Sequence, residues 1–199
     1  MVTRLLGTVL AVLICVGAGT GQEKVDAGTS RPATASHPAA TQPTAPRVLL
    51  REDFESGRGK WGGTVISDNL PAGSKYGLAA VPTETHWARR ATVGMGRSMR
   101  AGADTVLTFR YRVSRDIPVT IYIMNRTQKD NLRYDIDKPV RGQWTDVTLN
   151  VNKDFRRNDG SAGRLQPGDF LTSVSFLAGK TGRDEFDLAV DDVCLVARE

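Results

Sequence analysis

Five arginine, tyrosine and aspartate side chains occupy alternate positions on short segments with the hydrophobic pattern of β-strands. Arg110 and Arg112 alternate with apolar residues in one segment, and Tyr122, Arg133 and Asp135 do so in the next two. Successive side chains of a strand point to opposite faces of its sheet, so these five face away from the core. Such groups suit polyhydroxyl or uronate ligands, through bidentate and charge-assisted hydrogen bonds. We expect them to form one ligand-binding surface; the alternative is an ordinary solvated strand face.

One tryptophan stands in a polar segment where its ring could stack on a sugar. Trp87 follows His86 and precedes two arginines, between segments that resemble strands. An aromatic ring can pack against the apolar face of a sugar ring, so we expect Trp87 and His86 to contact a ligand. The alternative for Trp87 is a loop residue folded back onto the core.

Two adjacent carboxylates, Asp191 and Asp192, interrupt an apolar segment near the end of the chain. Val190 before them and Val193 after them have opposite parity, so a regular strand cannot bury both on one side. A β-bulge at the aspartate pair is therefore expected. Because an unpaired buried charge is costly, the two carboxylates need solvent, a cation or nearby arginines.

No catalytic motif is evident. His86 is the single histidine after residue 37, and Gly-x-Ser-x-Gly, His-Glu-x-x-His and Cys-x-x-Cys arrangements do not occur. Glycosidase chemistry needs two facing carboxyl groups, and the sequence singles out no such pair. We therefore expect a protein that is not an enzyme.

The elements that position these residues are short β-strands. Segments rich in Val, Ile, Thr, Phe and Tyr alternate with Gly, Asp, Asn and Pro, and helical periodicity is lacking. Residues 106–113 and 119–125 are joined by five residues and are expected to form an antiparallel pair. About eight strands without helices predict an all-β fold, a β-sandwich of jelly-roll type. The expected strands are residues 48–53, 79–81, 106–113, 119–125, 132–136, 145–151, 172–177 and 186–196.

The order of several short motifs resembles a known superfamily. Asp53-Phe54-Glu55-Ser56-Gly57 with Trp61 opens the domain, Gly142-Gln143-Trp144-Thr145-Asp146-Val147 follows, and Val190-Asp191-Asp192-Val193-Cys194-Leu195 closes it. This order resembles carbohydrate-binding-module jelly rolls with a galactose-binding-domain-like fold, over roughly residues 48–196. The resemblance implies packing roles for Trp61 and Trp144 and speaks for the fold more than for the ligand.

In the similar modules, a structural calcium ion is often held near the closing aspartates and the opening segment. The resemblance therefore implies Ca²⁺ bound by Glu55 with Asp191 or Asp192, and salt bridges from the aspartates to arginines are the alternative. It also implies a non-catalytic module that binds a polysaccharide or glycan. The first alternative is a structural or adhesion domain that binds protein at the cell envelope. The second is a polysaccharide lyase or glycosidase on a similar scaffold.

The N-terminal residues predict export. Residues 5–16 form an apolar run of signal-peptide length, too short to span a membrane, followed by a small-x-small pattern ending at Ala18. Lipid anchoring at Cys15 is disfavoured because bulky Ile14 precedes it. Residues 19–46, rich in Ala, Thr, Ser and Pro, form a disordered linker by composition. We thus expect a signal peptide at 1–18, a linker at 19–46 and a monomeric β-sandwich domain at 47–199, secreted or periplasmic.

The charge balance gives no reason to expect a nucleic-acid partner. The chain has 27 Lys+Arg and 22 Asp+Glu residues, a formal net charge of +5 and a pI of about 9.5. Its charges are interleaved, without a basic arm. The net positive charge is still compatible with a general preference for acidic polymers.

Overall fold

A computed structural model describes residues 45–83, 88–161, 163–179 and 187–199. Two antiparallel sheets make up the described part of the chain, so the expected all-β sandwich is confirmed. The six-stranded sheet has the order β10 (Thr145–Asn150), β7 (Asp104–Val113), β13 (Leu188–Arg198), β4 (Gly77–Ala79) and β3 (Thr64–Ile66), and β1 (Arg47–Glu52) also pairs with β13.

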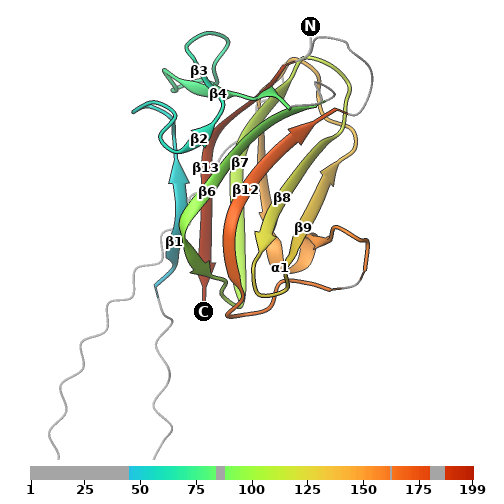
Figure 1. Cartoon of the computed structure of the whole chain (residues 1–199). Coiled ribbons are helices and arrows are strands. Elements are labelled where there is room, and N and C mark those ends of the chain that lie inside the picture. Colours follow the sequence, from blue (N-terminus) through green and yellow to red (C-terminus); the bar gives the residue numbers. More distant parts are fainter. Residues whose placement is uncertain (1–44, 84–87, 162, 180–186) are drawn as a thin grey trace, which may run out of the picture. The chain divides into compact units, whose positions relative to one another are not determined.

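The seven-stranded sheet carries the longest strand, β6 (Arg89–Arg100), close to one edge. Its order is β11 (Arg156–Arg157), β9 (Asp130–Ile136), β8 (Val119–Asn125), β12 (Phe170–Ala178), β6 and β2 (Trp61–Gly62), with β5 (Val81–Pro82) also paired to β6. A one-turn helix, α1 (Val151–Asp154), links β10 to β11. Figure 1 shows β6, β12, β8 and β9 side by side.

Apolar side chains from both sheets meet between them. Phe109 of β7 and Phe176 of β12 lie 4.8 Å apart between ring centroids, and both are buried. Trp61 is also buried and stacks on Phe176 at 6.1 Å. Its expected packing role is thereby confirmed. Each aromatic ring removes a large apolar area from water, which stabilises the contact between the sheets.

The expected antiparallel pairing of residues 106–113 with residues 119–125 is wrong. β7 pairs with β10 and β13, whereas β8 pairs with β9 and β12 in the other sheet. Residues 114–118 therefore cross from one sheet to the other, with Ile117 buried on the way. Both strands have one apolar face, and this crossing lets the two faces bury against each other from opposite sides.

Candidate functional site

The outer face of the seven-stranded sheet carries polar residues in aligned rows. Pairing places Thr92 of β6 beside Ser175 of β12, Ser175 beside Tyr122 of β8, and Tyr122 beside Arg133 of β9. The residues between them in each strand, such as Val93, Val174 and Ile123, are buried in the core. Strict alternation thus leaves one side chain in two from each strand on the outer face.

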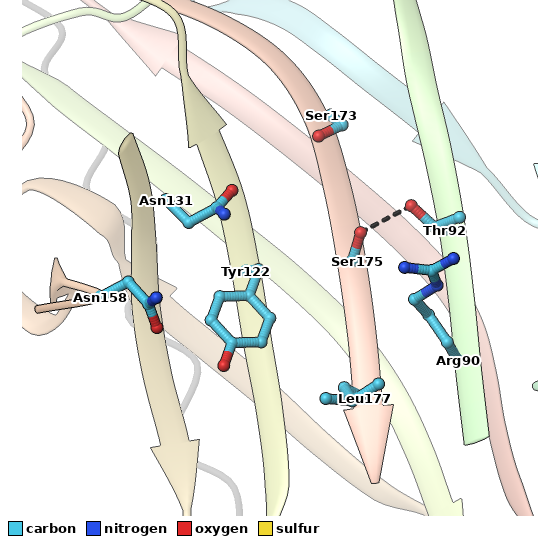
Figure 2. Close-up of a pocket in the computed structure, with 8 residues that line it drawn as sticks. All are labelled: Arg90, Thr92, Tyr122, Asn131, Asn158, Ser173, Ser175 and Leu177. Atoms are coloured by element: carbon cyan, nitrogen blue, oxygen red, sulfur yellow. Dashed lines mark hydrogen bonds between the residues drawn. The ribbon is translucent and has the colours of Figure 1, made fainter. Parts of the chain in front are cut away.

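A pocket of about 500 Å³ opens on this face, which we call the Arg90 pocket. Figure 2 shows hydroxyl and amide groups, one aromatic ring and one guanidinium group around it. The Thr92 and Ser175 hydroxyl oxygens are 2.6 Å apart and hydrogen-bonded. The lining residues are Arg90, Thr92, Tyr122, Asn131, Asn158, Ser173, Ser175 and Leu177. Such a lining combines donors and acceptors with an apolar ring face, as a ligand rich in hydroxyl groups requires.

A second pocket of about 290 Å³ adjoins the first, since both are lined by Tyr122 and Leu177. We call it the Arg133 pocket. Its other lining residues are Asp116, Ile117, Pro118, Thr120, Arg133, Asp135, Asp137 and Gly179. Together the two pockets form a groove that runs across β6, β12, β8 and β9.

The Asp135 carboxylate is the centre of a hydrogen-bonded cluster in the Arg133 pocket. It accepts hydrogen bonds from the Thr120 hydroxyl at 2.7 Å, Arg133 Nε at 2.8 Å and Arg156 Nη2 at 3.0 Å. Burial alone would raise the pKa of Asp135, but these hydrogen bonds and the Arg133 charge hold that pKa below its ordinary value. Asp135 therefore stays ionised and neutralises charge from the two arginines.

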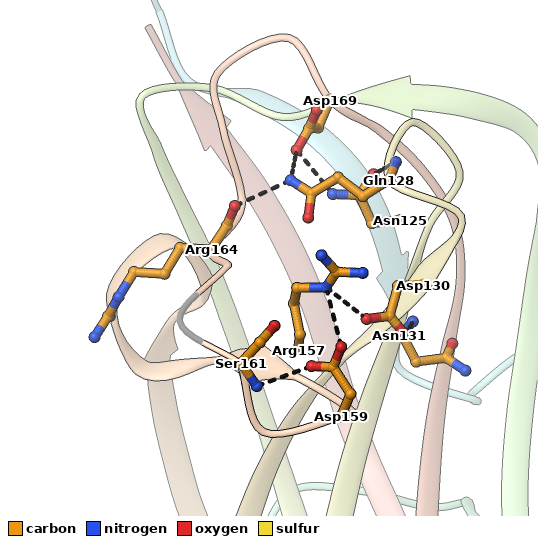
Figure 3. A network of polar contacts seen from close by, with 9 residues as sticks. All are labelled: Asn125, Gln128, Asp130, Asn131, Arg157, Asp159, Ser161, Arg164 and Asp169. Atoms are coloured by element: carbon orange, nitrogen blue, oxygen red, sulfur yellow. Dashed lines mark hydrogen bonds and ion pairs between the residues drawn. The ribbon is translucent and has the colours of Figure 1, made fainter.

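A polar network around Asp130 and Asn131 (Figure 3) lies beside the end of the groove that Asn131 and Asn158 line. The Asn158 backbone amide donates to the Asn131 backbone carbonyl at 2.8 Å, which joins the strand edge to the turn that follows β11. Asp130 accepts from the Asn131 backbone amide at 2.7 Å and from Arg157 Nε at 2.8 Å. These contacts hold the backbone of the two asparagines in place at the pocket.

A second cluster in Figure 3 anchors the β8–β9 turn. Asp169, almost fully buried, accepts from Asn125 Nδ2 at 2.8 Å and from Gln128 Nε2 at 2.7 Å. The Gln166 backbone amide donates to the same carboxylate oxygen at 3.0 Å. Because three donors converge on one buried carboxylate oxygen, this carboxylate holds the turn in place.

The expected single surface of five side chains is wrong, because the two sheets divide them. Arg110 and Arg112 project from the outer face of the six-stranded sheet, whereas Tyr122, Arg133 and Asp135 project from the seven-stranded one. The cause is the crossing between β7 and β8. Both strands alternate buried and outward-facing residues, but the outer faces of their two sheets lie on opposite sides of the sandwich.

On the six-stranded sheet, the two arginines have partners within the protein. Arg110 forms ion pairs with Asp146 at 2.8 Å and with Asp192 at 3.1 Å. The guanidinium of Arg112 lies 6.0 Å from the ring centroid of Trp144. Trp144 in turn donates its indole N–H to the Asn69 carbonyl at 2.6 Å. These contacts agree with a packing role for Trp144 at the edge of the sandwich.

Trp87 and His86 lie outside the described residues. The groove instead contains residues that the sequence did not single out, chiefly Arg90, Thr92, Asn131, Asn158, Ser173 and Ser175. Alternation of Arg90, Thr92 and Gly94 with buried Ala91 and Val93 was a usable signal for a strand here. Two nearby glycines weakened that signal, because glycine is depleted in strands.

The expected β-bulge at the aspartate pair is confirmed. The pairing register between β13 and β7 shifts between Asp191 and Cys194, and Asp192 has a φ of 48°. The bulge turns Val193 into the core and leaves Cys194 half-exposed. It also separates the two carboxylates, because Asp192 faces Arg110 outside whereas Asp191 is fully buried.

Asp191 has an oxygen that suits a cation. Its Oδ2 is buried, and no described residue forms a hydrogen bond to it. Burial raises the pKa of this carboxyl, although a hydrogen bond from Ser74 acts in the opposite direction. Glu55 lies against the same loop and accepts from the Lys75 and Tyr76 amides at 2.8 and 3.3 Å. Among the described residues no three His, Cys, Asp or Glu side chains form a metal-binding group. A cation here would therefore combine Asp191 and Glu55 with backbone oxygens, which calcium accepts.

Solved structures with a similar fold include carbohydrate-binding modules. TmCBM61, in complex with beta-1,4-galactotriose, is 12% identical over 77% of this chain and 99% of its own, with a TM-score of 0.48. The family 11 module from Clostridium thermocellum, in complex with a beta-1,3-1,4-mixed-linked tetrasaccharide, is 16% identical over 76% of this chain and 95% of its own, with a TM-score of 0.47.

An exo-beta-agarase gives a TM-score of 0.50 at 12% identity, over 75% of this chain and 25% of that one. No protein-family model matches the sequence, and no curated protein does. These likenesses concern the fold. The two antiparallel sheets agree with the β-sandwich that the sequence predicted.

Proposed function

We propose that this chain is an exported, non-catalytic module that binds a glycan chain along the outer face of the seven-stranded sheet. The Arg90 pocket carries the proposal, because hydroxyl, amide and guanidinium groups surround one tyrosine ring in it. Sugar rings present many hydroxyl groups and small apolar faces, and this lining offers partners for both. The adjoining Arg133 pocket gives the groove room for more than one sugar unit.

Binding without hydrolysis is favoured by the state of the carboxylates. The residues that line the Arg90 pocket include no Asp or Glu. In the neighbouring pocket, the pKa of Asp135 is held low by its hydrogen bonds, whereas a general acid for glycoside cleavage needs a raised pKa. These observations support a binding role.

A protein partner is the less favoured function. Among the described residues, the exposed large apolar side chains are Val48, Tyr76, Val81 and Val140, which belong to four separate segments. Protein-binding sites on a monomer usually need a contiguous apolar patch. The polar groove on the seven-stranded sheet fits a sugar better.

Export is proposed from the sequence of the first residues, with the signal peptide, linker and domain bounds given above. We also propose that the domain acts as a monomer, because one chain supplies the whole groove. No helix in the described part of the chain is long and apolar enough to cross a membrane.

We further propose a structural calcium ion at Asp191 and Glu55. The unpartnered Oδ2 of Asp191 supports it, since a buried carboxylate needs a positive partner. Asp192 fits less well because its carboxylate already faces Arg110. The ion would join the closing strand β13 to the opening segment and would act on stability.

A glycan-array screen with the purified protein tests the main proposal. We expect binding to one class of polysaccharide, saturable and competed by its oligosaccharides. Failure to bind any glycan, by a protein shown to be folded, would contradict the proposed function.

A further inference from the structure

Arg90 differs from Arg133 and Arg156 because no carboxylate among the described residues pairs with it. It is exposed on β6, and none of the described residues is seen to pair with it. Pairing places it beside Leu177 of β12, and Figure 2 shows its guanidinium lying near the Thr92 and Ser175 side chains. Its positive charge therefore belongs to the pocket.

The other guanidinium groups in or beside the groove have carboxylate partners. Arg133 and Arg156 both pair with Asp135, at 2.8 and 3.0 Å. Arg157, at the edge of the sheet, pairs with Asp130 at 2.8 Å. A ligand that needs a free cation would thus find it at Arg90 and not at these three positions.

The two halves of the groove have opposite charge. The Arg90 pocket has one cationic side chain and no carboxylate among its lining residues. The Arg133 pocket is lined by one arginine and by three aspartates, Asp116, Asp135 and Asp137. An anionic group is attracted to the first half and repelled from the second, and both effects act at close range in partly desolvated pockets.

We propose that the Arg90 pocket binds an acidic sugar unit, whose anionic group pairs with the Arg90 guanidinium while Tyr122 packs against the ring. This inference rests on the proposed glycan-binding function and names its ligand class. A planar guanidinium can donate two parallel hydrogen bonds to a carboxylate or a sulfate ester. Neutral hydroxyl and amide groups of Thr92, Ser175 and Asn131 remain for the sugar hydroxyls. The adjoining unit, in the Arg133 pocket, is neutral.

The test compares polymers that differ in charge alone. Polygalacturonate is paired with its fully methyl-esterified form, and dextran sulfate with dextran. A third set contains the neutral polymers β-1,4-galactan, xylan and mannan. Affinities are measured by calorimetry for the full chain and for Arg90→Ala. Arg126→Ala is the control, because it removes the same charge from an exposed position in the β8–β9 turn outside the pocket.

We expect the acidic member of one pair to bind at least about tenfold more tightly than its neutral partner, and Arg90→Ala to remove that difference. Arg126→Ala should change the difference between the acidic and the neutral polymer by no more than about twofold. The pair that responds identifies the anion as carboxylate or sulfate. If only neutral polymers bind, the acidic ligand is wrong. If both variants weaken acidic binding equally, Arg90 is not the group that binds the anion. Glycan binding stands in both cases. If no polymer binds, in any set, the proposed function itself fails.

Discussion

The Asp135 carboxylate, which lines the groove, makes the stability of the fold depend on pH. Its pKa is lower in the folded protein than in the unfolded chain, so its ionised form stabilises the fold at pH values above the ordinary aspartate pKa. That stabilisation is lost as the pH falls through the lowered folded pKa. We therefore expect the free energy of unfolding to fall steeply in acid, below about pH 4.

Asp135→Asn should flatten this acid dependence and destabilise the protein at pH 7. The amide cannot accept three charge-assisted hydrogen bonds, and Thr120, Arg133 and Arg156 lose their shared acceptor. The loss should be about 1–3 kcal/mol in denaturant unfolding at pH 7, and much smaller at pH 2. An equal loss at both pH values would mean that Asp135 acts through its shape and not its charge.

Asp191 provides the residue-scale test of calcium. In chelator, Asp191→Asn should raise the melting temperature, because it removes a buried charge that has no partner on Oδ2. With calcium, the wild type should instead have the higher melting temperature. Bound calcium stabilises it by mass action, by about 2.7 kcal/mol at 100 times the dissociation constant. Asp192→Asn is the matched control and should keep the calcium response. Identical wild-type melting curves with and without calcium, in metal-free protein, would contradict the site.

Strand β6 contributes Arg90 and Thr92 to the lining of the groove. Gly94 lies on its outer side beside Ser173, and a Cβ added there would meet no atom within 4 Å. A larger side chain can therefore be accommodated by the fold while it fills the end of the groove. Gly63 is the contrasting position, because a Cβ there would approach Leu78 Cγ to 2.7 Å.

Gly94→Val should accordingly abolish or strongly weaken glycan binding, by about tenfold or more, with the melting temperature unchanged or raised. The melting temperature should not fall, because valine favours strands and glycine loses more conformational entropy on folding. Gly63→Val should lower the melting temperature instead. Undiminished binding by Gly94→Val would show that the ligand does not reach this part of the face.

The same strand shows what sequence patterns could and could not predict. Segments with alternating β-branched and aromatic residues, such as 119–125, were identified with correct bounds. β6 was missed because Gly94 and Gly96 interrupt the pattern and arginines flank it, although its buried residues do alternate. Because no strand was expected between residues 81 and 106, the positions of Arg90 and Thr92 in the groove could not be predicted.

At the scale of the whole molecule, the limit was the pairing of strands. Parity within a strand follows from its sequence, so Tyr122, Arg133 and Asp135 were correctly expected to share an outer face. Which sheet a strand joins depends on contacts between residues far apart in the chain, and these leave no local pattern. Arg110 and Arg112 were therefore assigned to the wrong surface. The bulge at Asp191 was predictable because parity fails there within a single segment.

The division into two sheets also gives the most direct test of the central claim, that a glycan binds the outer face of the seven-stranded sheet. Tyr122→Ala changes that face, and Arg112→Ala changes the outer face of the six-stranded sheet. Both side chains point away from the core, so both variants should fold, which circular dichroism verifies.

The measurement is the dissociation constant of one screened oligosaccharide for the wild type and these two variants, by calorimetry. We expect Tyr122→Ala to weaken binding about thirtyfold, as the loss of a central aromatic contact of about 2 kcal/mol implies. Arg112→Ala should bind as the wild type does. A strong loss in Arg112→Ala, with Tyr122→Ala unaffected, would place the ligand on the opposite sheet and contradict the account.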